Sequence, residues 1–188
     1  AELSYRKAIE IKPDYADAHY NLGLVLLDLG KSQNAELSTR KVIELNPHYA
    51  NAHYNLGLIL KDLGNLQDAE LSTRKAIELK PDYADAHLNL GSILLDIGKS
   101  QNAELSYRKA IEIRPDYADA HYNLGKVLLD LGNLKDAELS TRKAIKIKPD
   151  FAEAHLSLGE ILKDIGQLKE AELSTRKAIE LNPNYAKA

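Results

Sequence analysis

The chain has 188 residues, no cysteine and a formal net charge of −3. The lack of cysteine excludes disulfides and thiolate zinc sites, and the charge balance offers no basic excess for binding a polyanion. The longest apolar run, around 22–27, is far shorter than the roughly 20 residues of a membrane-spanning helix. We therefore expect no nucleic-acid partner and no membrane partner, and we predict a cytoplasmic location.

The chain consists of one 34-residue unit written repeatedly. Its prolines recur every 34 residues from Pro13, and its glycines form two further series from Gly23 and Gly30. A fixed period of this length indicates a stacked repeat array, or solenoid. Because the sequence opens in the middle of a unit, we expect it to be a piece of a longer protein. The predicted division is 1–12 (the second helix of an incomplete repeat), 13–46, 47–80, 81–114, 115–148, 149–182, and 183–188 (the start of another repeat).

Each unit is predicted to hold two helices and no strand. The first helix begins after Pro13 and Asp14, carries Asp17 in its first turn, and ends at Gly30, where glycine accepts a left-handed conformation. The second helix runs from about Gln33 to Leu45. We expect an all-α fold, since no segment shows the alternating pattern of a strand.

Packing between the two helices is predicted from the helical period of about 100° per residue. Gly23 and Ala35 are small, and small residues let two helix backbones approach closely. In the second helix, Glu36 stands four residues before Arg40, a spacing that favours solvated surface ion pairs and recurs in every unit. The apolar stripe that faces the second helix is expected to comprise Ala18, Leu22, Val25, Leu26 and Leu29.

The unit resembles the tetratricopeptide repeat over essentially the whole chain, without insertions. Leu22, Gly23, Ala35 and Pro47 match the family pattern, whereas His19 stands where tryptophan is usual. The Asn-Leu-Gly core, preceded by Ala-Asp-Ala-His, is most similar to the arrays of O-linked N-acetylglucosamine transferases and of bacterial scaffold proteins. The resemblance implies a right-handed superhelical α-solenoid of antiparallel helix pairs.

One face of each first helix is the candidate binding site. Asp17, Asn21, Leu24 and Asp28 fall within about 40° of one another, opposite the core, with Tyr20 at their edge. The resemblance places this face on a concave wall, where asparagines hold the backbone of an extended peptide. A primary amide offers both a donor and an acceptor, which matches one peptide unit. The alternative is that these amides cap or bridge neighbouring repeats. The asparagine series continues as Asn55, Asn89 and Asn123, and Ser157 interrupts it.

The same face is acidic. Its nine carboxylates and three lysines give a formal charge of −6, which disfavours nucleic acid and favours amide-rich or basic peptides. A second interpretation is that some aspartates only support the turn to the next helix. The carboxylates are Asp17, Asp85, Asp119 and Glu153 together with Asp28, Asp62, Asp96, Asp130 and Asp164, and the lysines are Lys61, Lys126 and Lys163.

Two positions on this face vary between units and are predicted to select side chains of the ligand. We expect apolar contacts in the first two units and charged contacts near Lys126, Glu160 and Lys163. The Tyr20 position becomes Tyr54, Leu88, Tyr122 and Leu156, and the Leu24 position becomes Leu58, Ser92, Lys126 and Glu160.

Two further series recur with the same period. The histidines at 19, 53, 87, 121 and 155 are interpreted as partly buried structural residues, because neighbouring helices stand about 8–10 Å apart and no unit supplies further metal ligands. The outward leucines at 3, 37, 71, 105, 139 and 173 are either incidental or a lateral assembly surface.

The sequence therefore predicts a non-catalytic scaffold that binds an extended peptide or protein segment, with no cofactor and no metal. No nucleophile with a base, phosphate loop or metal cluster is recognisable. One alternative is a substrate-recruitment arm of a larger transferase whose catalytic domain lies outside these residues. Another is a structural module, natural or designed, that associates head to tail through its terminal helices.

Overall fold

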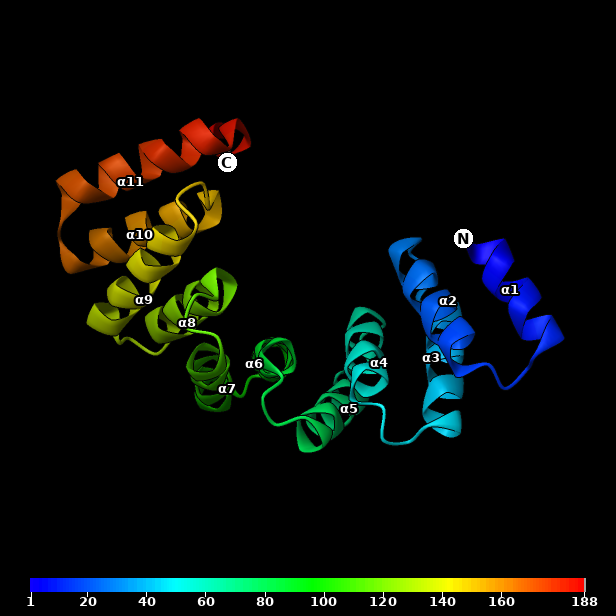
Figure 1. The fold of residues 1–188 in the computed structure, drawn as a ribbon. Coiled ribbons are helices and arrows are strands. Elements are labelled where there is room, and N and C mark those ends of the chain that lie inside the picture. The colour runs from blue at the N-terminus through cyan, green and yellow to red at the C-terminus, as the bar shows by residue number, and fades with distance from the viewer. Residues whose placement is uncertain (188) are drawn as a thin grey trace. The chain divides into compact units, whose positions relative to one another are not determined.

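The computed structural model describes residues 1–187, which contain α-helices, one 3₁₀ helix and no strand (Figure 1). These residues form two compact units, Ala1–Gly98 (unit 1) and Lys99 onward (unit 2). Unit 1 holds α1 (Glu2–Ile11), α2 (Ala16–Asp28), α3 (Ser32–Leu45), α4 (Ala50–Asp62), α5 (Leu66–Leu79) and α6 (Ala84–Asp96). Unit 2 holds α7 (Ser100–Ile113), α8 (Ala118–Asp130), α9 (Leu134–Ile147), α10 (Ala152–Ile165), α11 (Leu168–Leu181) and η1 (Pro183–Lys187).

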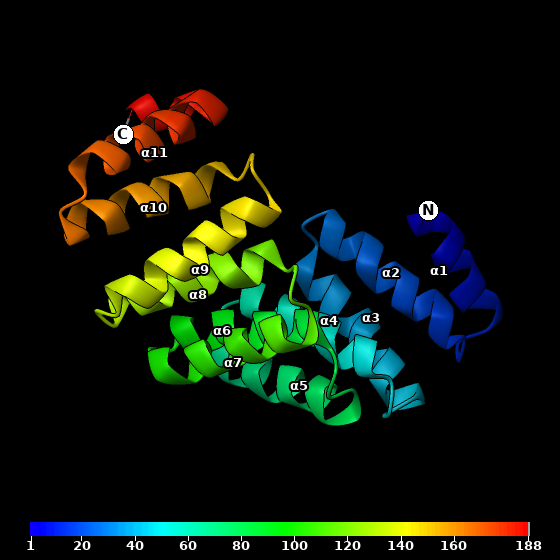
Figure 2. The same ribbon diagram turned by 60° about the vertical axis from the view of Figure 1, so that its left-hand side comes forward.

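Consecutive helices pack in pairs. In unit 1, α2 packs on α3 and α4 packs on α5; in unit 2, α8 packs on α9 and α10 packs on α11. The members of each pair lie side by side in both ribbon views (Figures 1 and 2). Each pair also contacts the next first helix, as α3 contacts α4 and α9 contacts α10. The predicted all-α solenoid of helix pairs is confirmed.

Helix ends follow the predicted chemistry. The predicted left-handed glycine is confirmed: Gly30 has φ +68°, its N–H bonds the carbonyl of Leu27 at 2.9 Å, and the Lys31 N–H bonds Leu26 at 2.8 Å. These two bonds close the helix with a Schellman arrangement. The helix α2 begins after Asp14, as expected, with Tyr15 at the cap position and no side-chain cap bond.

The buried stripe of the first helix is shorter than predicted. Leu22 and Leu26 are buried against Ala35 of α3 and Ile59 of α4, so the core lies between the pair and the next repeat. Leu29 is 55% exposed, and its assignment to the stripe was wrong. Leu63, the equivalent residue after α4, packs against Leu22 and Leu26 of the preceding first helix, whereas α2 is the first of the first helices in residues 1–187, so Leu29 lacks this neighbour.

Close approach of paired helices depends on the glycine in each first helix. A Cβ added at Gly57 would overlap Oγ1 of Thr73 and lie 3.3 Å from the carbonyl oxygen of Ala69, both on α5. Thr73 and Ala69 are themselves fully buried. The repeated glycine therefore has the packing role that its recurrence indicated.

Aromatic rings connect α2, α4 and α8 to the start of the next repeat. Tyr54 of α4 contacts Tyr83 with ring centroids 4.9 Å apart and a tilt of 45°, and Tyr20 contacts Tyr49 at 5.1 Å. Burial raises the pKa of Tyr83, and the neighbouring Tyr54 hydroxyl raises it further. Lys80 Nζ lies 4.7 Å from the centroid of the Tyr83 ring. The ring of Tyr83 is thus packed between repeats with its hydroxyl held in the neutral form.

Replacing Gly57 by alanine is expected to destabilise the protein by up to about 2 kcal/mol. Overpacking typically costs about 1–3 kcal/mol, and it opposes the gain of about 1 kcal/mol in helix propensity. Urea denaturation measures the change. Introducing Gly57→Ala into a Thr73→Ala background, which lacks the overlapping hydroxyl, is the control. An equal cost in both backgrounds would show that the contact with Thr73 is not responsible.

Replacing Tyr83 by phenylalanine is expected to weaken the loss of stability at alkaline pH. Because the folded pKa of Tyr83 is raised, its contribution is complete below the unfolded pKa of about 10 and declines as pH rises beyond it. Urea denaturation between about pH 9 and 11 measures the slope. Phe151 occupies the equivalent position in a later repeat, so Tyr83→Phe is expected to fold normally. A slope identical to that of the parent protein would contradict the prediction.

Candidate functional site

The predicted binding face lies on the first helices, α2, α4, α6, α8 and α10, and is called the first-helix face below. On α2, Asp17 and Asp28 are exposed, whereas Tyr20, Asn21 and Leu24 are half-buried. This face therefore presents carboxylates to solvent beside partly covered apolar and amide groups. The corresponding residues are Tyr54, Asn55 and Leu58 on α4, Asn89 and Ser92 on α6, Tyr122, Asn123 and Lys126 on α8, and Glu160 on α10.

The asparagines differ in solvent exposure and in their hydrogen-bond partners. Asn55 and Asn89 are each only 7% exposed. Asn89 donates from Nδ2 to Thr73 Oγ1 at 3.2 Å, which connects α6 to α5 of the preceding repeat. Asn21 is half-buried and donates to the carbonyl oxygen of Asp17 in its own helix at 2.8 Å. The bridging role that the sequence left open thus occurs at Asn89.

Ser157 replaces asparagine in the last complete repeat and behaves differently. Its Oγ is buried and has no hydrogen-bond partner among the described residues. Thr141, which occupies the position equivalent to Thr73, donates instead to the carbonyl oxygen of Ala137 at 2.8 Å. The serine side chain is shorter than asparagine, so the bridge between repeats is missing at this position.

Some carboxylates of the first-helix face also join repeats. Asp62 Oδ2 accepts a hydrogen bond from Ser32 Oγ at 2.5 Å, and Asp96 forms an ion pair with Lys61 at 3.3 Å. Lys61 also donates to Ser92. These two aspartates therefore join neighbouring repeats, a role different from the predicted support of the turn to the next helix. In unit 2, the exposed charged residues of this face are Asp119, Asp130, Glu153, Glu160 and Asp164 beside Lys126 and Lys163.

The tyrosines predicted to make apolar contacts with a ligand already pack against other residues of the protein. Tyr20 and Tyr54 pack on the next repeat, as described above, and Tyr122 packs on Phe151 at 4.9 Å. Lys126 Nζ lies 5.7 Å from the centroid of the Tyr122 ring. These tyrosines are therefore half-buried members of ring pairs and not isolated side chains.

Each of the five histidines bonds back to the turn before its helix. The Nε2 of His19 lies 2.9 Å from the carbonyl oxygen of Pro13, and the other four repeat this contact at 2.9–3.0 Å. A carbonyl oxygen only accepts, so Nε2 carries the hydrogen and donates. Burial lowers the pKa of His121, which favours the neutral ring. Residues 1–187 gather no group of three or more His, Asp or Glu side chains suited to a metal.

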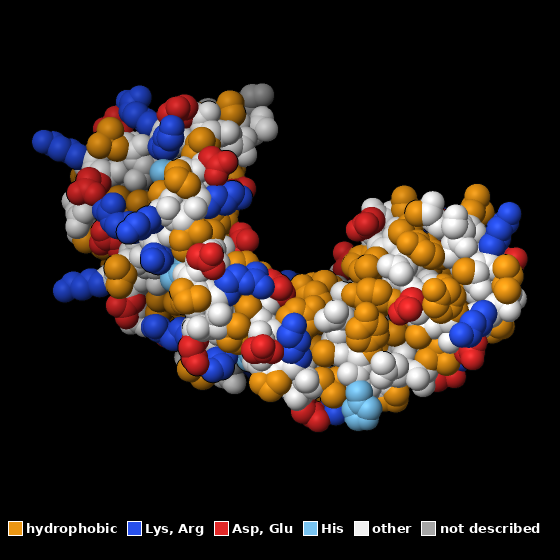
Figure 3. All heavy atoms as spheres, in the orientation of Figure 1, with side chains coloured by type: hydrophobic (Ala, Val, Ile, Leu, Met, Phe, Trp, Pro, Cys, Tyr) orange, Lys and Arg blue, Asp and Glu red, His pale blue; other side chains and the backbone are white. Residues whose placement is uncertain are grey.

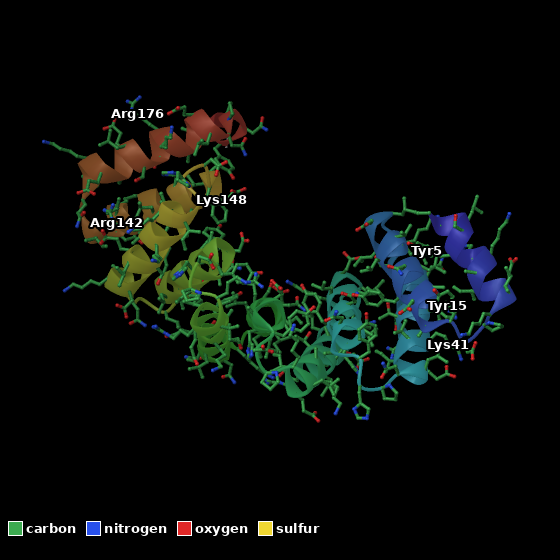
Figure 4. The ribbon with its side chains drawn as sticks, in the orientation of Figure 1. Tyr5, Tyr15, Lys41, Arg142, Lys148 and Arg176 are labelled. Atoms are coloured by element: carbon green, nitrogen blue, oxygen red, sulfur yellow. The ribbon has the colours of Figure 1, made fainter. Side chains whose placement is uncertain are left out.

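Sequence analysis missed two recurring contacts that fixed spacings could have indicated, and two bonds between repeats. The histidine always follows its proline by six residues. In four of the repeats a lysine or arginine precedes this proline and lies over the aromatic ring three residues later, as Lys148 (labelled in Figure 4) does over Phe151 at 4.7 Å. The bonds from Ser32 to Asp62 and from Asn89 to Thr73 span 30 and 16 residues. Predicting them requires the packing distance between repeats.

Comparison with known proteins identifies the repeat. Models of the tetratricopeptide repeat match 50–83, 73–104, 118–151 and 152–185, and a model described as TPR repeat matches 3–30 and 91–132. No curated protein sequence matches the chain. Among the described residues, no helix combines the length and apolar composition needed to cross a bilayer.

Solved structures agree with these matches. A crystal structure of MamA is 31% identical, with 89% of this chain and 98% of that chain covered and a TM-score of 0.78. A second MamA structure is 30% identical, covering 92% and 94%, with a TM-score of 0.78. YrrB, described as a TPR protein with an unusual peptide-binding site, shares the fold at 22% identity, covering 97% and 94%, with a TM-score of 0.77. The chain therefore belongs to the tetratricopeptide repeat family.

Proposed function

We propose that this protein is a non-catalytic scaffold that binds an extended peptide or protein segment along the first-helix face. Membership of a repeat family whose relatives include a protein with a peptide-binding site supports this role. The observation that carries the proposal is the recurrence, on all five first helices, of an exposed aspartate (Asp28 and its equivalents) on the same face as a half-buried tyrosine or leucine (Tyr20 and its equivalents). An extended peptide is also periodic, so a repeated surface can contact it at repeated positions.

Charge indicates the class of segment. In unit 2, five exposed carboxylates of this face outnumber the two lysines Lys126 and Lys163. The resulting negative potential attracts a segment that carries lysine or arginine and repels nucleic acid. We therefore propose a basic or amide-rich peptide as the ligand, in contact with Glu160 and the neighbouring carboxylates.

The amides are proposed to contribute unequally. Asn21 and Asn123 are half-buried, so part of each amide is accessible to a peptide backbone. Asn89 uses one N–H to bond Thr73. Its second N–H and its carbonyl oxygen remain as hydrogen-bonding capacity. We propose that the half-buried amides bind the ligand, while Asn89 mainly holds two repeats together.

The proposed role does not depend on where the chain begins or ends. A recruitment arm for a transferase domain outside these residues would use the same first-helix face, so it is a special case of the proposed binding. Head-to-tail association through the terminal helices, the absence of a cofactor and of a nucleic-acid partner, the unit boundaries and a cytoplasmic location all stay predictions.

Removing carboxylates from the first-helix face is expected to weaken binding of a basic peptide. Peptides are first selected from a random library on the 188-residue chain, and their Kd values are measured by fluorescence anisotropy. The variant Asp119→Asn with Glu153→Gln is expected to raise Kd about five- to tenfold, since each exposed charge contact contributes up to about 1 kcal/mol. Added salt should raise the parent Kd as well.

The matched control removes two exposed carboxylates from the second helix α11, through Glu172→Gln with Glu180→Gln. Its Kd is expected to equal that of the parent. Equal loss in both variants would indicate a nonspecific charge effect, and binding unchanged in both would refute the assignment of the ligand to the first-helix face.

Replacing the asparagines one at a time is expected to separate ligand binding from stability. Asn123→Ala should raise the peptide Kd and leave the thermal midpoint unchanged, because its amide is partly accessible. Asn89→Ala should lower the midpoint, because it removes the bond to Thr73, worth about 1 kcal/mol. Calorimetry and anisotropy on the same samples measure both. The reverse pattern would assign the structural role to Asn123 instead.

A further inference from the structure

The second helices carry a second repeated surface, which the proposed peptide binding does not use. Unit 1 contains two surface pockets, called holes below. The first, of about 350 Å³, is lined by residues of α1, α2 and α3, and the second, of about 460 Å³, by residues of α3, α4 and α5. In unit 2, an equivalent hole of about 550 Å³ lies between α7 and α9 above α8. The same residue types line all three at the 34-residue period. The hole formed by α3, α4 and α5, called the middle hole below, is lined by Arg40, Ile43, Glu44, His53, Leu56, Leu71, Ser72 and Lys75.

Each hole has an apolar floor and an exposed leucine on its rim. Leu56 and His53 of the first helix form the floor of the middle hole, and Ile43 forms one wall. The rim leucines Leu37 and Leu71 are 69% and 67% exposed. Exposed leucines beside an apolar hole favour burial against a partner, since burying a leucine side chain contributes about 1.5–3 kcal/mol.

Charges around the holes are balanced. Arg40 pairs with Glu36 at 2.8 Å, and Lys75 pairs with Glu78 at 2.7 Å. Lys41 of α3, labelled in Figure 4, pairs with Glu44 at 2.6 Å. On the face that Figure 3 shows, acidic and basic side chains are scattered among apolar ones over unit 1. A second copy therefore meets no excess of like charge on this surface, whereas two first-helix faces would repel one another.

We propose that two copies of this chain associate through the second helices of unit 1, with the exposed leucines of each copy entering the holes of the other. A two-fold arrangement brings residue i of one copy to residue j of its partner and residue j to residue i, so one surface must supply both leucine and hole. Leu37, Leu71 and the two holes meet this requirement. The spacing of the leucines equals that of the holes, because both follow the same repeat. The occupant that fits is therefore a second copy.

The test compares two double variants of the whole chain by sedimentation equilibrium. Leu37→Glu with Leu71→Glu places charges on the proposed interface and is expected to lower the dimer association constant at least about 100-fold, since every leucine removed contributes tenfold or more. Ile11→Glu with Leu29→Glu is the matched control in the same unit. Both of its residues are exposed and neither lines a hole. This control is expected to dimerise as the parent does.

Cysteine pairing tests the arrangement separately, because the native chain contains no cysteine. Chains with Leu37→Cys are mixed with chains carrying Ser72→Cys, which lies in the middle hole, and are oxidised. Mixed disulfides are expected to exceed those of the control mixture of Ile11→Cys with Ser72→Cys, since the bond requires Cβ atoms about 3.5–4.5 Å apart.

Circular dichroism checks that every variant is folded. A parent protein that stays monomeric at about millimolar concentration would overturn the proposal, as would a dimer that survives the change of both leucines. A monomer that instead binds a foreign helical peptide in the holes would also overturn it. None of these outcomes bears on peptide binding at the first-helix face, which is measured separately.

Discussion

The structure depends on the close contact of two helix backbones within each repeat. At Gly57 there is no room for a Cβ, because Thr73 and the carbonyl oxygen of Ala69 lie against the glycine. The helix tolerates the conformational cost of a central glycine, about 1 kcal/mol, because separation of the pair would expose Leu56 and Leu60. The same contact brings Thr73 within reach of Asn89 on the next first helix. At Gly57 one small residue thus sets the packing of a pair and contributes to the position of the following first helix.

The fold could be predicted almost entirely from sequence because every unit repeats the same local information. Gly30 and Ala35 have the predicted conformation or burial, and the pairs of glutamate and arginine form as their four-residue spacing indicated. Leu29 was misplaced because its burial depends on a preceding repeat: the equivalent Leu63 packs against Leu22 and Leu26 of α2, whereas Leu29 follows the first of the first helices in residues 1–187. The error therefore occurs where burial depends on a neighbouring repeat and not on the helix itself.

The candidate site was harder to predict because the sequence shows on which face of a helix a residue lies but not which residue it bonds. Asn21, Asn55 and Asn89 occupy one sequence position, but Asn21 bonds its own helix while Asn89 bonds a neighbouring one. The difference arises from contacts between repeats, which a single helix does not encode. The holes between second helices escaped notice for the same reason, since a hole needs residues from three helices. At Ser157, one substitution leaves a buried hydroxyl without a hydrogen-bond partner among the described residues.

The two proposed surfaces lie on different helices but are connected by one hydrogen bond. Peptide binding is proposed for the first helices and self-association for the second helices, so neither surface covers the other. Thr73 nevertheless belongs to α5, a second helix, and accepts the bond from Asn89 on α6, a first helix. A peptide that bonded the Asn89 amide would have to break or share this bond, which contributes about 1 kcal/mol. The proposed peptide binding would therefore weaken the packing between repeats at this position, and its affinity would depend on how much of that packing the peptide replaced.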